Sequence, residues 1–489
     1  MAPPSPAGTQ EIAWRPCPDA DGVECATITV PLDWAEPGGD TVSIGLARRK
    51  ATGPGSRIGS VILHPGGPGM SGVDVIKQKK DVFTPAVSAR FDVIGYDPRG
   101  ISTSTQVTCD PELLEQAQTL KARAGRSSAD FDAFAKANTE LSEDCRRRTG
   151  PLYDHLDDRQ VVRDVDAIRA ALGENKITQV GYSYGTLTGQ QYAQMFPQHV
   201  RAMVDDGNMD HSIGSIWDFL DAQTAAIEKN FVQWADWCDR TPDCALYGQD
   251  AKKVYAELRE RAKNGTLKDP DTGEQVDFVA LTAIAQAANL PEYWTRLAGR
   301  LKNLYDGKST TASPTGAPTP TTSPSAPPVA LQNYPRQAMF CQDWTFRVSG
   351  YTEFQAGLAR LSERYPNVNW NPNATEAALD CVGYRGQATN PQAPLQNRRT
   401  PPLVMVGNVN DYATVYPWSR NAATQSGATL LTYEGFGHTV YPSTVAFGSS
   451  TCVNDAIDAY LINLKLPGKG LRCPGIEVPG GGEPPSPTS

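Results

Sequence analysis

Short apolar runs bounded by glycine, proline or aspartate recur in the first and last parts of the chain. Runs of this kind are typical of strands that are buried on both faces of a mostly parallel sheet. The six clearest runs are SVILH (60–64), FDVIGYD (91–97), KITQVGYS (176–183), AMVDD (202–206), LVMVGN (403–408) and TLLTYE (429–434). The pattern therefore predicts an α/β fold built on a parallel sheet.

Helical periodicity fills the intervals between these runs. In DRQVVRDVDAIRAALG (158–173), apolar residues recur at helical spacing from Val161 to Leu172, and Gly173 supplies a C-terminal stop. The alternation of strand and helix breaks over residues 210–395, which are rich in tryptophan, glutamine and alanine in helical patterns. We interpret 210–395 as an inserted, mainly helical cap domain.

Two segments have a composition that does not support a packed core. Residues 309–328 consist almost wholly of serine, threonine, proline, alanine and glycine, which bury too little apolar surface to offset chain entropy. The C-terminal segment 475–489 is similar. We expect a disordered linker within the cap and a disordered tail, with the core formed by 9–209 and 396–474.

Charge and hydropathy narrow the range of partners. The 489 residues carry a net charge of −9, and no basic stripe is present, which argues against nucleic acid or an anionic membrane surface. No uninterrupted apolar run approaches the length of a membrane span. We expect no nucleic acid, no membrane and no second subunit as a partner, so the protein should be a monomer that acts on a small molecule or a peptide.

The ten cysteines lie in loop-like segments and have an even count, which indicates disulfides and an oxidising compartment. No C-x2-C pair is present and no histidine lies at ligand spacing from a cysteine pair, which disfavours zinc. Sequence does not fix the connectivity. Pairing neighbours in sequence order gives Cys17–Cys25, Cys109–Cys145, Cys238–Cys244, Cys341–Cys381 and Cys452–Cys473. The opening MAPPSPAGTQ lacks the charged and apolar regions of a signal peptide. Because the cysteines indicate secretion, we expect that a signal peptide was removed and that Met1 was added.

One strand-like run leads directly into a serine held between two glycines. The run 176–182 ends in GYSYG, where Ser183 has the G-x-S-x-G spacing, and a helical pattern follows. Side chains larger than Gly181 and Gly185 would collide across such a tight turn, which projects the serine hydroxyl above the sheet. The motif also occurs by chance, so it indicates a nucleophile only together with a base, an acid and an anion site.

A histidine and an aspartate follow in the order that a serine nucleophile of this type requires. His438 lies in GFGHTVY, a glycine-flanked loop after the last strand-like run, and we prefer it as base over His211 in DDGNMDHS. Asp411 follows the run 403–408 at a strand's carboxyl end, where the sites of α/β proteins are built. We predict His438 as the base and Asp411 as the acid.

Main-chain N–H groups must also stabilise the oxyanion of the reaction. The glycines of HPGGPGMSG, residues 64–72, leave amides free to approach an anion. We predict the N–H groups of Gly67 and Tyr184 as the oxyanion hole. Asp97 and Arg99, in YDPRGIST, are interpreted as structural residues that order the adjacent loop.

Several segments, taken together and in order, resemble one family. They are VPLDWAEPGGDTVSIGLARRKA, VILHPGGPGMSG, FDVIGYDPRGISTST, VGYSYGTLTGQQYAQMFPQHVRAMVDDG and GFGHTVY. Over nearly the whole chain they resemble the secreted actinobacterial tripeptidyl aminopeptidases, including their C-terminal region, within the proline iminopeptidase branch of the α/β hydrolases. The resemblance implies an α/β-hydrolase fold with a cap inserted after Asp206, the set Ser183, Asp411 and His438, and release of short peptides or amino acids from a free N-terminus.

The acid segment departs from the pattern of that family. The family usually has G-x-x-D-P-V-T-P, whereas GNVNDYATVYP places Asn410 at the expected offset from Gly407 and Asp411 one residue later. We retain Asp411 because Thr414 then matches the threonine of the pattern. The missing prolines indicate an altered loop.

Three functions are compatible with these residues. The first is a secreted serine exopeptidase that releases tripeptides or smaller units, and the second is an esterase or amidase that uses the same triad on a specialised acyl substrate. The third is a binding protein without catalysis, which the intact set of residues disfavours. None requires a metal or an organic cofactor. In an aminopeptidase the substrate ammonium needs a carboxylate in the cap, for which Asp343 in CQDW is the candidate; the other interpretation is a solvated or disulfide-supporting aspartate.

Overall fold

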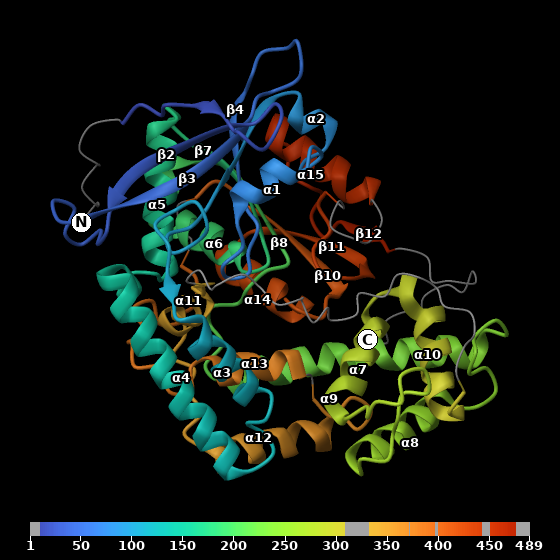
Figure 1. The fold of residues 1–489 in the computed structure, drawn as a ribbon. Helices are drawn as coiled ribbons and strands as arrows, with labels where there is room; N and C mark the ends of the chain where they lie inside the picture. Colours follow the sequence, from blue (N-terminus) through green and yellow to red (C-terminus); the bar gives the residue numbers. More distant parts are fainter. Residues whose placement is uncertain (1–9, 309–331, 371, 397–399, 443–449, 476–489) are drawn as a thin grey trace. The chain divides into compact units, whose positions relative to one another are not determined.

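The fold is known from a computed structural model that describes residues 10–308, 332–370, 372–396, 400–442 and 450–475 (Figure 1). The linker expected at 309–328 lies outside the described residues. So does the tail expected at 475–489, apart from its first residue.

The chain divides into two compact units, which we describe separately. The core unit comprises the described parts of Met1–Phe219, Leu331–Gln355 and Ala377–Gly475, and the helical unit those of Leu220–Ala330 and Ala356–Glu376. The helical unit is therefore smaller than the segment 210–395 that the sequence pattern set apart, because 331–355 and 377–395 group with the sheet.

A ten-stranded sheet forms the centre of the core unit, in the order β1-β2-β3-β5-β4-β7-β8-β10-β11-β12. The pairs β1–β2, β2–β3 and β3–β5 are antiparallel and the other pairs are parallel. The strands are β1 Arg15–Pro16, β2 Glu24–Pro31, β3 Thr41–Arg49, β4 Gly59–His64, β5 Phe91–Tyr96, β7 Ile177–Tyr182, β8 Val200–Asp206, β10 Val404–Asn410, β11 Thr429–Phe436 and β12 Arg472–Pro474. The mostly parallel sheet confirms the fold class predicted from the sequence.

Helices cover both faces of this sheet (Figure 1): α1 contacts β3 and β5, α6 contacts β4, β7 and β8, and α15 contacts β8 and β12. The helices within the core unit are α1 Gly72–Gln78, α2 Pro85–Ser88, α3 Pro111–Lys121, α4 Ser128–Thr149, α5 Asp158–Ala171, α6 Gly185–Met195, α11 Arg336–Asp343, α14 Tyr416–Ser426 and α15 Thr451–Asn463. A short ladder joins β6 Thr108–Cys109 to β9 Gln332–Asn333. The helix expected at 158–173 is α5, and the Asp157 side chain caps it by accepting the N–H groups of Arg159 and Gln160.

The helical unit contains α8 Ala251–Lys263, α9 Phe278–Ala285 and α10 Trp294–Asp306. Three helices have residues in both units: α7 Ile216–Arg240, α12 Tyr351–Arg364 and α13 Pro372–Asp380. Among all the helices that are described, none is long and apolar enough to cross a membrane.

Burial explains the apolar runs that predicted the strands. Every residue of β4 and of β5 is buried, because each strand has helices on both faces and strands on both edges. Fully burying one valine, leucine or isoleucine contributes about 1.5–3 kcal/mol. A strand in this position therefore has a continuous apolar run, without alternating polar residues.

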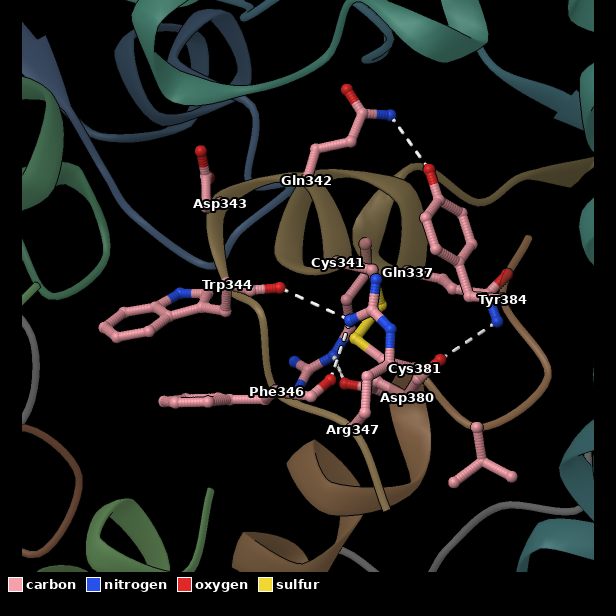
Figure 2. Close-up of a disulfide and its surroundings, with 12 residues drawn as sticks. Gln337, Cys341, Gln342, Asp343, Trp344, Phe346, Arg347, Asp380, Cys381 and Tyr384 are labelled. Carbon is pink, nitrogen blue, oxygen red and sulfur yellow. Dashed lines mark hydrogen bonds and ion pairs between the residues drawn. A yellow bond between two sulfur atoms is a disulfide. The ribbon is translucent and has the colours of Figure 1, made fainter. Parts of the chain in front are cut away.

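All ten cysteines form disulfides, and each bond joins neighbours in sequence order: Cys17–Cys25, Cys109–Cys145, Cys238–Cys244, Cys341–Cys381 and Cys452–Cys473. The bond between Cys341 and Cys381 joins α11 to the residue that follows α13 (Figure 2). It ties the segments 331–355 and 377–395 to each other, and both belong to the core unit.

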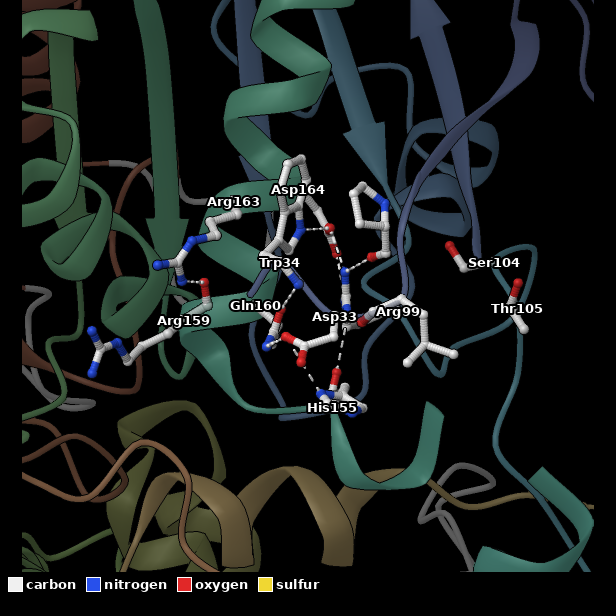
Figure 3. Close-up of polar contacts among 12 residues, drawn as sticks. Asp33, Trp34, Arg99, Ser104, Thr105, His155, Arg159, Gln160, Arg163 and Asp164 are labelled. Atoms are coloured by element: carbon white, nitrogen blue, oxygen red, sulfur yellow. Dashed lines mark hydrogen bonds and ion pairs between the residues drawn. The ribbon is translucent and has the colours of Figure 1, made fainter. Parts of the chain in front are cut away.

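A buried ion pair holds the loop after β5 (Figure 3). Arg99 donates to Asp164 of α5 through Nε and Nη2, at 2.7 Å each, and both side chains are fully buried. The same guanidinium donates to the main-chain oxygens of Pro31 and Leu32, and Asp164 accepts the indole N–H of Trp34 at 2.8 Å. Arg99 therefore connects the loop after β5 to α5 and to the end of β2.

Removing one charge of this pair should destabilise the core unit strongly. In Asp164→Asn, Arg99 stays buried without its counter-charge, and breaking such a pair typically costs about 3–5 kcal/mol. Chemical denaturation followed by near-UV circular dichroism measures the free energy of unfolding. The control is Glu140→Gln, which breaks a solvent-exposed ion pair with Lys136 and should change that free energy by less than about 1 kcal/mol. Equal effects of the two variants would contradict the structural role of Arg99.

Candidate active site

Ser183 occupies a strained turn between β7 and α6. Its φ is 53°, in the left-handed region that residues other than glycine rarely adopt. Its N–H donates to the main-chain oxygen of Asp206 at 3.0 Å, which fixes the turn to the end of the neighbouring strand β8. The serine is therefore held at the carboxyl edge of the parallel sheet.

The glycine-rich loop 64–72 passes directly against this turn. A Cβ on Gly66 would lie 2.4 Å from the main-chain oxygen of Tyr182 and 3.1 Å from both Ser183 Cβ and Tyr184 N, so only glycine fits there. In the part of the chain that is described, no hydrogen bond from the N–H of Gly67 or of Tyr184 is found. The loop thus brings its backbone into contact with the serine turn.

Asp411 and His438 form a hydrogen-bonded pair at the ends of β10 and β11. His438 Nδ1 lies 2.9 Å from Asp411 Oδ2 and 3.1 Å from Oδ1. The Asp411 side chain is fully buried, whereas that of His438 is 21% exposed. With Nδ1–H donated to Asp411, the Nε2 lone pair of the neutral imidazole is left to accept a proton.

The Asp411 carboxylate is further oriented by its own turn. Oδ1 accepts the N–H groups of Ala413 and Thr414 at 2.8 and 3.0 Å, and Oδ2 accepts the Thr414 hydroxyl at 3.0 Å. The side chain of the adjacent Asn410 bonds to the backbone instead: its amide donates to Gly435 O at 2.8 Å. Of the two neighbours, Asp411 is the one that contacts His438.

The end of β8 links the serine turn to the histidine. A Cβ on Gly207 would lie 3.3 Å from His438 Cε1 and 2.7 Å from Thr414 Oγ1. Ser183, which is bonded to Asp206 O, and His438, which lies against Gly207, therefore contact consecutive residues at one strand end. The structure brings Ser183, Asp411 and His438 to the same edge of the sheet.

Neighbouring carboxylates control the charge of His438. Burial alone would lower the pKa of His438, but Asp411, and to a smaller extent Asp206, raise it above its usual value. Burial also raises the pKa of the Asp206 carboxyl to about 7. The site therefore favours the imidazolium form more than an isolated buried histidine would.

Two other histidines of the core unit lie in different settings. His211 Nε2 is 2.7 Å from the main-chain oxygen of Asp343, and burial lowers the pKa of His211 to about 4. His64 Nδ1 accepts the N–H of Gly66 at 3.2 Å, and burial lowers its pKa to about 4 as well. Neither pairs with a carboxylate as His438 does.

Asp343 lies at the C-terminal end of α11 and is almost fully buried. Oδ2 accepts the Tyr184 hydroxyl at 2.7 Å, and Oδ1 accepts the Asp158 N–H and the Asn390 side-chain amide at 2.8 Å each. Burial, with the nearby Asp157 carboxylate, raises the pKa of Asp343 to about 7. All these contacts are with protein groups, and one of them reaches the residue after Ser183.

Sequence reasoning missed Asp206 as a contributor to this site. The available signal was the pair of aspartates that ends the apolar run 202–206. Aspartate is rarely buried without a partner, and the carboxyl ends of parallel strands are where the sites of α/β proteins are built.

The chain matches the model of a family described as "alpha/beta hydrolase fold" over residues 59–443 and belongs to that family. It is similar to serine protease Hip1 of Mycobacterium tuberculosis, with 28% identity covering 95% of this chain and 91% of the relative. It is 29% identical to a tripeptidyl aminopeptidase of Streptomyces lividans, covering 92% of this chain and 83% of the relative. A carboxylesterase B of Mycobacterium tuberculosis is also 29% identical, covering 97% and 92%. The protein is thus a serine hydrolase with both peptidases and an esterase among its relatives.

The contacts of Asp411 and Asn410 predict different effects of substitution. Asp411→Asn should lower kcat by roughly ten thousandfold, as in a comparable triad, because an amide does not hold the histidine in the required tautomer. Asn410→Ala, which removes the bond to Gly435 O, should have a mild effect because Asn410 does not hold His438. Steady-state kinetics with any substrate that the enzyme hydrolyses measure kcat for both variants. A larger loss of kcat in Asn410→Ala than in Asp411→Asn would overturn the choice of Asp411 as the acid.

Proposed function

We propose that the protein is a secreted exopeptidase that releases short peptides or amino acids from free N-termini through an acyl-enzyme on Ser183. His438, oriented by Asp411, takes the Ser183 proton, and Oγ attacks the carbonyl carbon of the scissile bond. The amides of Gly67 and Tyr184 stabilise the oxyanion. His438 protonates the leaving amine, and water then hydrolyses the ester with His438 again as base.

The observation that carries this mechanism is the convergence of three elements at one sheet edge. They are the strained serine after β7, the 2.9 Å pair of Asp411 and His438, and the loop that passes against the serine turn. The N–H groups of Gly67, in this loop, and of Tyr184, directly after Ser183, have no hydrogen-bond partner in the described residues, and a developing oxyanion requires donors of this kind.

Peptide rather than ester chemistry is supported by the peptidases among the relatives, each aligned over most of both chains. Secretion is supported by the five disulfides, which are typical of oxidising compartments. A carboxylesterase at equal identity keeps a second candidate open: an esterase or amidase with the same triad.

Asp343 enters this proposal in a different role from the ammonium site considered from the sequence. Its carboxylate already accepts three hydrogen bonds from protein groups, which leaves little room for a substrate ammonium. We propose that Asp343 holds the Tyr184 side chain and thereby fixes the amide that follows Ser183.

The nucleophile can be tested directly with a fluorophosphonate probe, which reacts with activated serines. The wild-type protein should be labelled at Ser183, and Ser183→Ala should lose both labelling and turnover, on the order of a millionfold in rate, while it remains folded. Peptide mapping by mass spectrometry locates the label. Labelling at another serine, with turnover kept in the alanine variant, would refute the mechanism.

Acetylation of the substrate separates the two candidate functions. An exopeptidase must recognise the free α-ammonium, and loss of a buried charge pair costs several kcal/mol. Acetylating the N-terminus of a good peptide amide should therefore lower kcat/KM by about a hundredfold or more, since each 1.4 kcal/mol is tenfold. A simple acyl ester serves as the matched comparison. Equal turnover of free and acetylated peptides would favour the esterase or amidase.

A further inference from the structure

Asp206, the last residue of β8, contacts both the serine turn and the loop that carries His438. Its main-chain oxygen accepts the N–H of Ser183 at 3.0 Å. Its Oδ2 accepts the N–H groups of Val440 and Tyr441 at 2.7 Å each. These two residues belong to the histidine loop, which we define as residues 437–441. One residue thus sets the position of the serine turn and of the loop that carries His438.

The histidine loop has a backbone that needs such support. Gly437 has φ 99° and Thr439 has φ 61°, so the residues on both sides of His438 lie in the left-handed region. Two successive N–H groups that converge on one carboxylate oxygen form an anion-binding nest. The nest fixes the turn immediately after His438 and hence the direction of its imidazole.

The other carboxylate oxygen of Asp206, Oδ1, does not bond to the histidine loop. Oδ1 is buried and, among the described residues, has no hydrogen-bond partner. The ionisable groups that face this carboxyl are His438, Asp411 and the hydroxyl of Tyr182, which is itself buried without a partner in the described part of the chain. Of these three, only His438 becomes positively charged. A buried negative charge acts strongly on such a neighbour because water does not screen it.

We propose that Asp206 is a second positioning carboxylate of the site, which holds the histidine loop through Oδ2 and stabilises by its charge the imidazolium formed when His438 takes the Ser183 proton. This inference rests on the proposed function of Ser183, Asp411 and His438. In the step concerned, the proton passes from Ser183 Oγ to His438 Nε2. In this step Asp206 neither donates nor accepts a proton, and it contacts no substrate atom.

The test is Asp206→Asn, which keeps an oxygen for the two loop amides and removes the charge. We expect kcat to fall about tenfold or more with little change in KM, because the interaction is made in the transition state. Without the negative charge the pKa of His438 falls. The acid limb of the kcat/KM profile should therefore move to lower pH by roughly one unit. A purely structural residue would lower activity without moving this limb.

The matched control is Asp205→Asn, one residue earlier on the same strand. Asp205 is equally buried, but among the described residues neither of its carboxylate oxygens has a hydrogen-bond partner, so the substitution makes the same chemical change without touching the histidine loop. This variant should keep the kcat and the acid limb of the wild-type protein. An unshifted acid limb in Asp206→Asn, or the same shift in both variants, would overturn the inference.

A second measurement does not depend on turnover. In Ser183→Ala protein, 15N NMR of the histidine rings measures the pKa of His438, whose signal is identified among the five histidines by its loss in Ser183→Ala/His438→Gln. The pKa of His438 should be lower in Ser183→Ala/Asp206→Asn than in Ser183→Ala, and an unchanged pKa would overturn the inference. Where Asp206→Asn does not fold, Asp206→Ser gives the same comparison. Retained turnover in Ser183→Ala would instead refute the proposed function, whatever Asp206 does.

Discussion

The parallel pairing of β4, β7, β8, β10 and β11 is the constraint on which the site depends. In this register, Gly181 lies opposite Asp205 and Tyr182 opposite Asp206, so the turn at Ser183 begins where β8 ends. Val406 of β10 pairs with Asp206 in turn, and Asn410 pairs with Phe436 of β11. A shift of one residue in these pairings would separate Ser183, Asp411 and His438.

The sheet brings these ends together, and buried polar contacts then fix them. The Arg99–Asp164 pair anchors the loop after β5, and in that loop Asp97 accepts the Ser71 hydroxyl at 2.5 Å. Ser71 caps α1, which follows the glycine-rich loop. The loop after β5 is therefore bonded on one side to α5 and on the other to the loop that passes against Ser183. Each of these buried charged groups needs an opposite charge or hydrogen-bond donors to offset the loss of water.

The sequence predicted the strands that are buried on both faces, because their continuous apolar runs have no other simple explanation. It did not reveal β2 and β3 as strands, since β2 alternates between exposed and buried residues and has no such run. The division of the chain into the two compact units was also not visible in the sequence. Whether a helix such as α11 groups with the sheet or with the helical unit depends on contacts between distant segments, among them the Cys341–Cys381 bond.

In the candidate site, too, residues with a local sequence pattern were predictable and contacts between distant segments were not. Ser183 has a local signature, and Asp411 and His438 are recognisable from their order and from the strands before them. The contact of Asp206 with the histidine loop joins residues 234 and 235 positions apart through main-chain amides, which leave no pattern in the side-chain sequence. The contacts of Asp343 were hidden for a related reason. Its aspartate identity is visible in the sequence, but its partners Tyr184, Asp158 and Asn390 come from three separate segments.

The two carboxylates beside His438 have complementary surroundings. Asp411 uses both oxygens: besides His438 it accepts two main-chain amides and one hydroxyl, so it is rigidly oriented and can fix the imidazole. Asp206 uses a single oxygen for two amides and keeps the other without a partner among the described residues. A fully bonded carboxylate has much of its charge compensated locally, whereas an unbonded buried oxygen leaves its field to act on the nearest cation. Orientation and charge stabilisation of one histidine can thus be divided between two strands of the same sheet.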